Sequence, residues 1–152
     1  MSGLAYTARH PATAYTNVAS VIAQLVTSAD TPITLKKMRL EGGVTSANQG
    51  IVVVQAGFYA TPHAAGTVGT PLAKARRNTL ACDTAFRYAS ATLGTTFTVW
   101  REWQWNIAIP WEDQPGDPML EMEIPAATNF ALILPSASGT PTISGEFEFE
   151  ER

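Results

Sequence analysis

The chain has 152 residues, of which 45% are hydrophobic and 15% are charged, and its net charge is −3. This composition excludes a disordered tail and a coiled coil, and the absence of 18 consecutive apolar residues argues against a membrane-spanning helix. The length is that of one domain, and the single cysteine, Cys82, excludes an intramolecular disulfide framework.

The first 16 residues differ from the rest of the chain. They are rich in Ala, Thr and Tyr, which predicts an N-terminal arm over residues 1–16 that orders on contact with a partner. Tyr6 and Tyr15 are the arm's candidate contact residues. The remaining residues, 17–152, are expected to form a single folded domain that survives deletion of the arm.

Residues 18–26 carry two conflicting signals. Val18, Val21, Ile22 and Leu25 recur at helical spacing, which is typical of an amphipathic helix. The same β-branched side chains suit a strand, and the strand-rich surroundings favour it because they offer a sheet to join.

Alternation predicts strands along the rest of the chain. From Phe97 to Trp111, seven of the eight odd positions are large and apolar, so we expect a long strand with one buried face that ends or bends at Pro110. The same alternation lies at 120–124 and 143–150 and, less cleanly, at 33–40. The runs at 51–59 and 130–134 are apolar on both faces, and at 130–134 this is expected of a central strand that is covered on both sides.

Turn-forming residues separate these runs. Gly, Pro, Asn and Asp cluster between the predicted strands, at the spacing typical of a sandwich or barrel. About eight strands with alternating faces bury those faces best as two packed sheets. The sequence therefore predicts an all-β fold, an antiparallel β-sandwich of the jelly-roll type.

The residues offer little catalytic chemistry. His10 and His63 lie far apart in the sequence and match no metal-ligand or nucleophile motif, and no glycine-rich phosphate loop is recognisable. We therefore expect no catalytic residues, no metal, no cofactor and no enzymatic activity. The acidic residues near 112–123 and 146–151 are interpreted chiefly as solvated strand faces, with a subunit contact, metal binding or catalysis by paired carboxylates as alternatives.

Four tryptophans lie within twelve residues. Trp103 and Trp105 share the apolar face of the predicted strand, so a core role is favoured for them. Trp100 lies on the opposite face and is the best candidate for a contact with another subunit or with a sugar ring, and Trp111 is a further interface candidate.

Charge is distributed unevenly. Residues 1–101 hold nine basic and three acidic side chains, whereas residues 102–152 hold one basic and ten acidic ones. A mixed solvated surface explains this pattern, and charge complementarity between neighbouring copies is the alternative. We expect no direct contact with nucleic acid, because the net charge is negative and the basic residues lack interleaved aromatics.

The chain resembles a family of small jelly-roll structural proteins of tailed bacteriophages, which includes capsid decoration, or cement, proteins. The similarity runs in order through short segments, of which the tryptophan followed by a Pro-Gly loop and then Ile-Pro-Ala is the most telling. The segments are 21–26, 35–44, 51–61, 65–71, 110–118, 124–129 and 139–143.

The resemblance implies a virion protein that self-associates, commonly as a homotrimer, and binds the major capsid protein on the outer surface of the capsid. The expected function is mechanical stabilisation of the shell, after synthesis in the host cytoplasm. A carbohydrate- or receptor-binding module of a phage tail or fibre is the alternative.

Overall fold

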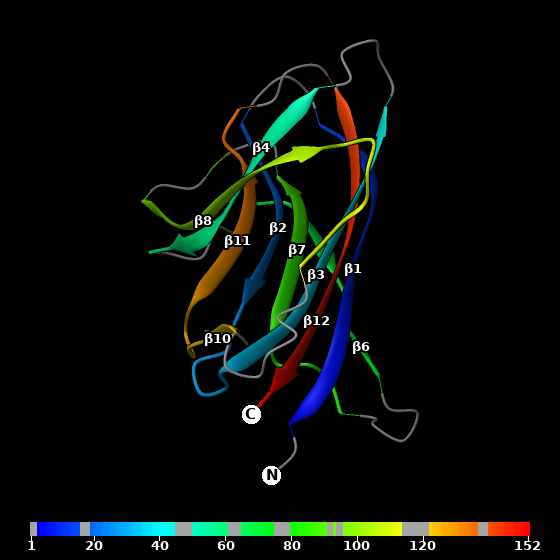
Figure 1. Ribbon diagram of the computed structural model, residues 1–152. Helices are drawn as coiled ribbons and strands as arrows, with labels where there is room; N and C mark the ends of the chain where they lie inside the picture. Colours follow the sequence, from blue (N-terminus) through cyan, green and yellow to red (C-terminus); the bar gives the residue numbers. More distant parts are fainter. Residues whose placement is uncertain are drawn as a thin grey trace.

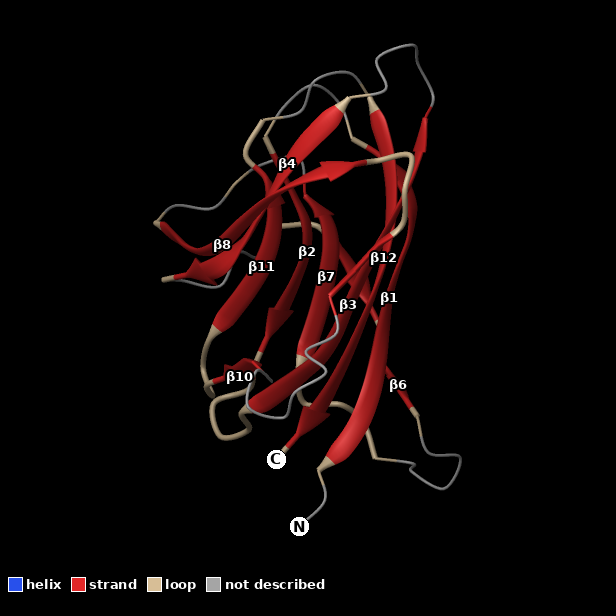
Figure 2. Cartoon of the chain, in the orientation of Figure 1, coloured by secondary structure: helices blue, strands red, loops and turns tan. Residues whose placement is uncertain are grey.

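The structure is a computed structural model that describes residues 3–15, 19–44, 50–60, 65–74, 80–90, 93, 96–113, 122–136 and 140–152. The described residues form twelve strands and no helix. All strand pairs are antiparallel, and the strands form two sheets that pack face to face (Figures 1 and 2). The predicted all-β antiparallel sandwich is confirmed, and its strand order is compatible with a jelly roll.

Each sheet contains six strands, and we call them sheets A and B. Sheet A has the order β10-β3-β12-β1-β6, with β9 also paired to β3. Its strands are β1 (Leu4–Ala14), β3 (Ile33–Val44), β6 (Leu72–Ala73), β9 (Trp111–Asp113), β10 (Met122–Ile124) and β12 (Pro141–Glu151). Sheet B has the order β5-β7-β2-β11-β4-β8. Its strands are β2 (Ser20–Val26), β4 (Ile51–Tyr59), β5 (Thr67–Gly69), β7 (Ala85–Ser90), β8 (Phe97–Asn106) and β11 (Asn129–Leu134).

The number of long strands agrees with the expected number of about eight strands. Eight of the strands contain six or more residues, and the other four contain two or three. Within the ambiguous segment 18–26, residues 20–26 form β2, a strand between β7 and β11, and Val18 lies outside the described residues. The sheet context therefore decides against the helical spacing.

The predicted N-terminal arm is part of the sandwich. Residues Leu4–Ala14 are not a separate arm, because they form β1, which pairs with nearly the whole length of β12. The inward side chains of β1 complete the core of the sandwich, as Tyr6 and Ala8 show. The domain therefore begins within the first residues and not at residue 17, and deletion of 1–16 removes a strand of sheet A.

The core lies between the two sheets. β12 supplies Phe147 and Phe149 on its inward face, and β11 supplies Phe130 and Leu132 from the opposite sheet. These side chains are at most 1% exposed, and Phe147 packs against Phe86 of β7 with 5.9 Å between ring centroids. Alternation at period two in β12 thus yields one buried and one outward row.

The alternation predicted from Phe97 to Trp111 holds only in part. Trp105 and Ile107 are buried, but Val99 and Ile109 on the same predicted face are exposed. A register shift in the pairing of β8 with β4 interrupts the pleat between Arg101 and Val99. The bulge places Val99 on the other face from Trp103 and Trp105. The strand also ends at Asn106, before the predicted end at Pro110, so Ile109 lies in the turn that follows β8.

Two local features differ from a simple pattern of strands and turns. Gly42 and Gly43 are adjacent glycines but lie inside β3 and not in a turn, and a Cβ at Gly42 would collide with the carbonyl of Ile107. The two-residue strand β6 is followed by residues 75–79, which lie outside the described residues.

Candidate docking surface

The outer face of sheet A is charged, and its charges are paired. Glu146, Glu148 and Glu150 alternate with inward residues along β12 and therefore point outward. Glu146 accepts from Arg9 at 2.8 Å and Glu148 from Lys74 at 2.5 Å, while Glu150 lies 3.5 Å from Lys36. The row of glutamates expected as a solvated face is thus held between basic side chains of the same chain.

These pairs explain the uneven charge distribution. Among the described residues, ion pairs between a basic residue from 1–101 and an acidic residue from 102–152 include Arg9–Glu146, Lys36–Glu150, Lys37–Glu112 and Lys74–Glu148. The N-terminal and C-terminal regions meet because β12 lies between β1 and β3. Much of the charge complementarity considered between copies is therefore satisfied within one chain.

The outer face of sheet B is apolar and largely covered. Val21, Tyr59, Ala131 and Ile133 are each at most 4% exposed and form a cluster of their own. Phe97 packs against this cluster, with its ring centroid 4.9 Å from that of Tyr59. The expectation that 130–134 is a strand covered on both faces is confirmed, since all six residues of β11 are buried.

Ala65, just before β5, contacts this face. Gln24, only 2% exposed, donates to the carbonyl of Ala65 at 3.2 Å. Gln24 pairs with Ala131 in the register of β2 and β11, and paired residues of neighbouring strands share a face. Ala65 therefore lies over part of the face that points away from the core.

The edge strand β8 carries the exposed aromatic. Val99 pairs with Gly57 and Arg101 with Ala56, so Trp100 has no partner in the pairing and lies at a β-bulge. Trp100 is 50% exposed and Val99 46% exposed. We call these two residues the β8 edge patch; it is apolar, and β8 has a paired neighbour on one side only (Figure 1).

The other tryptophans are structural. Trp103 of β8 stacks on Trp111 of β9, with 4.4 Å between ring centroids, and so joins the edges of sheets B and A. Trp105 is buried and donates its indole N–H to the carbonyl of Ile109 at 2.7 Å. Trp111, predicted as an interface residue, is thus half-buried in a contact within the chain.

Tyr6 and Tyr15 are not surface residues. Tyr6 is 1% exposed and stacks on Phe149, and Tyr15 is 4% exposed beside His10. Of the four predicted interface residues, Trp100 is the one that is exposed to solvent. The exposure of Val99 had no clear signal in the sequence, although Arg101 in the apolar row marks the place where the pleat is interrupted.

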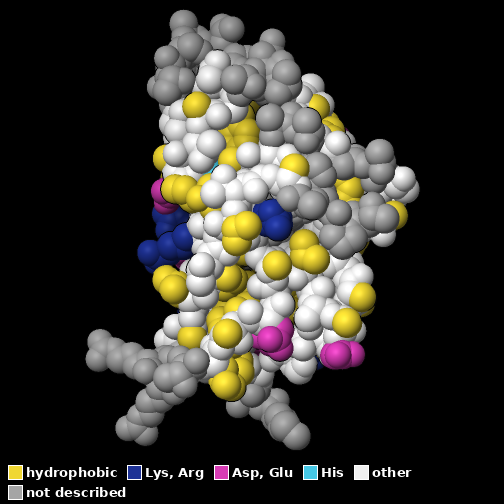
Figure 3. Space-filling model, turned by 180° about the vertical axis from the view of Figure 1, so that it is seen from behind, with side chains coloured by type: hydrophobic (Ala, Val, Ile, Leu, Met, Phe, Trp, Pro, Cys, Tyr) yellow, Lys and Arg dark blue, Asp and Glu magenta, His cyan; other side chains and the backbone are white. Residues whose placement is uncertain are grey.

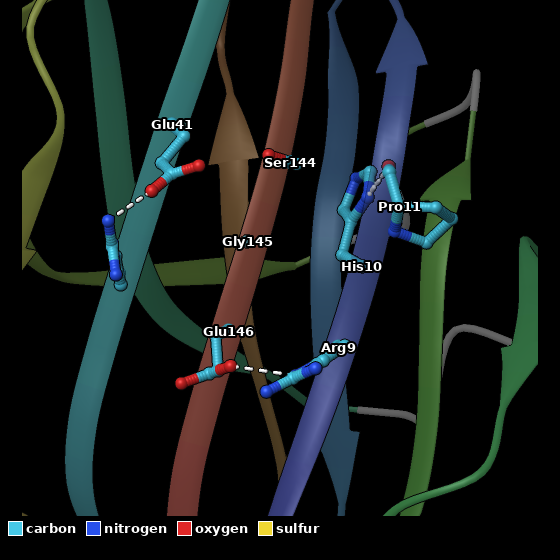
Figure 4. Close-up of a pocket in the computed structure, with 8 residues that line it drawn as sticks. Arg9, His10, Pro11, Glu41, Ser144, Gly145 and Glu146 are labelled. Carbon is cyan, nitrogen blue, oxygen red and sulfur yellow. Dashed lines mark hydrogen bonds and ion pairs between the residues drawn. The ribbon is translucent and has the colours of Figure 1, made fainter.

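A shallow depression of about 540 Å³ lies on the outer side of sheet A. It is lined by Arg9, Pro11, Arg39, Glu41 and Glu146, together with His10, Ser144 and Gly145. Arg9 binds Glu146, as Figure 4 shows, and Arg39 binds Glu41, so the basic groups around the depression are already engaged.

The described residues contain no group of three or more His, Cys, Asp or Glu side chains placed to hold a metal ion. Within the same residues, no helix is long and apolar enough to cross a membrane. Figure 3 shows hydrophobic side chains spread over the rear face, with basic and acidic side chains in a few separate groups.

No family model, curated protein or solved structure matches this chain. The candidate surface therefore rests on the geometry of the chain itself. Its distinctive feature is the β8 edge patch, in which a half-exposed tryptophan lies beside a half-exposed valine on the edge strand of sheet B.

Proposed function

We propose that the chain is a non-enzymatic structural protein of a tailed-phage virion, a decoration or cement protein that binds the outer surface of the capsid. The exposed Trp100 is the observation that carries the docking role. Tryptophan is enriched among residues that dominate binding energy at protein interfaces, and Trp100 lies where another protein has access to it. The resemblance noted in the sequence supports the virion as the location.

The expected partners are the major capsid protein and further copies of the chain, assembled as a homotrimer. A sandwich with most of its apolar area in a closed core presents a stiff body to its neighbours. If several such bodies bridge adjacent capsid subunits, weak contacts add through multivalency and oppose the outward pressure of packaged DNA.

Binding to capsid shells tests the proposal. Shells of the phage that encodes the chain, prepared without their decoration protein, are mixed with the wild-type chain, Trp100→Ala or Leu72→Ala, and bound protein is measured after sedimentation. Leu72 is the matched control, because it is a 63% exposed apolar residue on β6 of the other sheet.

We expect wild type and Leu72→Ala to bind equally, and Trp100→Ala to bind at least about tenfold more weakly. Failure of the wild-type chain to bind shells overturns the capsid proposal. Equal binding by Trp100→Ala overturns the role of the β8 edge patch.

One observation favours a second candidate, a carbohydrate- or receptor-binding module of a tail or fibre. Beyond Trp100, β8 presents the exposed polar residues Glu102, Gln104 and Asn106, and Gln55 donates to the Glu102 carboxylate at 2.5 Å. An aromatic face next to fixed amide and carboxylate groups suits a sugar ring. A glycan array probed with wild type and Trp100→Ala tests this candidate, and the absence of a signal that depends on Trp100 counts against it.

A further inference from the structure

His10 is a histidine inside the sandwich. It is 2% exposed and lies on β1 opposite Gly145 of β12. The pairing of β1 with β12 shifts register between His10 and Thr13, so the histidine precedes an irregularity in the strand. His10 also lines the depression on sheet A (Figure 4).

The imidazole connects three parts of the chain. Its Nδ1 lies 2.5 Å from the carbonyl oxygen of Pro11, and its Nε2 contacts the hydroxyl of Tyr15. That hydroxyl lies 3.2 Å from the carbonyl of Ile22 in β2, and the ring of Tyr88 in β7 packs 5.0 Å from the imidazole. Release of His10 therefore loosens contacts from β1 to both β2 and β7.

The surroundings favour the neutral ring. Nδ1–H then donates to the carbonyl of Pro11. The Tyr15 hydroxyl has a single proton, which it donates either to the carbonyl of Ile22 or to Nε2, and in the second arrangement both ring nitrogens are satisfied without a charge. Burial lowers the pKa of His10 and, together with Tyr88, raises the pKa of Tyr15. Tyr15 is therefore neutral near neutral pH and supplies no negative charge.

The charged residues that line the same depression as His10 are Arg9, Arg39, Glu41 and Glu146. Arg9 binds Glu146 and Arg39 binds Glu41, and no described hydrogen bond or ion pair joins a carboxylate to the imidazole. An imidazolium formed here is thus buried without a described counter-charge, which is costly.

β1 is the strand of sheet A that can respond. On one side it pairs with β12 along most of its length, but on the other side its described pairs with β6 involve only Tyr6 and Thr7. At His10 the described pairing is therefore on one side, and local opening of the strand breaks fewer contacts than opening of a central strand.

We infer that His10 is an acid-sensitive latch, which holds β1 in sheet A while the imidazole is neutral and releases the strand when the imidazole takes up a proton. In the released strand the imidazole has its ordinary pKa of 6.5, whereas in the closed strand its pKa is lower. The opened form therefore binds the proton more readily, and below pH 6.5 its population rises by up to about tenfold per pH unit. The inference does not depend on the proposed function.

Hydrogen exchange of the full chain at pH 7.5 and 5.5 tests the latch, with β11 as the internal reference for the pH dependence of exchange itself. The chain has two histidines, His10 and His63, so His63→Gln is the matched control for His10→Gln. In wild type and His63→Gln we expect β1 to lose up to about tenfold more protection than β11 on acidification. In His10→Gln we expect no such difference.

An equal loss of protection in His10→Gln, or no selective loss in wild type, overturns the inference. A measurement on the wild-type chain covers the case in which His10→Gln does not fold. The NMR resonance of the His10 ring is followed against pH, and we expect its midpoint below 6.5 in the folded chain. A midpoint at or above 6.5 overturns the latch.

Discussion

The outer face of sheet A carries pairs of opposite charges in contact with solvent, whereas the outer face of sheet B carries apolar side chains under cover. On sheet A, β12 alternates inward phenylalanines with outward glutamates that meet basic partners from β1, β3 and the segment after β6. On sheet B, Ala131 and Ile133 face away from the core and are still buried.

The difference between the two outer faces indicates which parts of the molecule stabilise the fold and which are available for binding. Exposed ion pairs contribute little free energy each, so the charged face of sheet A serves mainly solubility. The covered face of sheet B removes further apolar area from water, and the uncovered apolar residues at its edge, Val99 and Trp100, remain for a partner.

The largest expected effect breaks the covered face. Ile133→Ala removes a side chain that is 3% exposed, and we expect the free energy of unfolding to fall by about 2–5 kcal/mol because a cavity remains. Ser144→Ala is the counterpart on the outer side of sheet A, with an expected change within about 0.5 kcal/mol. Chemical denaturation measures both, and equal losses contradict the contrast between the faces.

A smaller effect compares two neighbouring glutamates. Glu151 is 7% exposed and accepts from the backbone N–H of Thr84 at 2.7 Å and from the thiol of Cys82 at 3.1 Å. Glu151→Ala leaves these donors without their acceptor, so we expect a loss of about 1–3 kcal/mol in unfolding free energy. Glu150→Ala removes a partly exposed ion pair with Lys36 and is expected to cost at most about 1 kcal/mol.

The thiol provides a second readout of that variant. Burial, and after it the hydrogen bond and charge of Glu151, raise the pKa of Cys82 to about 12. Loss of Glu151 is therefore expected to lower this pKa and to speed alkylation of the thiol by iodoacetamide at pH 8. An unchanged rate argues against the contact between Cys82 and Glu151.

The smallest effect concerns the charged face itself. A double-mutant cycle on Arg9 and Glu146, whose atoms lie 2.8 Å apart, is expected to give a coupling of about 0.2–1 kcal/mol that decreases in 1 M salt. The Arg9 side chain is 75% exposed, which keeps the pair well solvated. A coupling above this range, or one insensitive to salt, indicates that the face is less accessible to solvent than its exposure implies.

The strands that the sequence predicted best are those with one wet and one dry face. β12 follows from the alternation of Ile143, Phe147 and Phe149 with serine and glutamates, and β11 follows from its unbroken apolar run. β1 was missed because its inward residues, Tyr6, Ala8 and His10, lack the large aliphatic signal of a core strand.

The candidate site was predictable only in part. Trp100 could be singled out because it breaks the apolar alternation, but the exposure of Val99 depends on a bulge in the pairing of β8 with β4. The contacts of His10 were not predictable either, since Tyr15 is five residues away and Tyr88 arrives from another strand.

The sequence by itself determined the β-sandwich, because period-two burial is a local property that each strand carries in its own residues. The tertiary structure decided which charges meet, what covers the outer face of sheet B, and which tryptophan remains accessible. Those outcomes depend on the order and register of strands that lie far apart in the chain, and the side chains of one strand do not specify them.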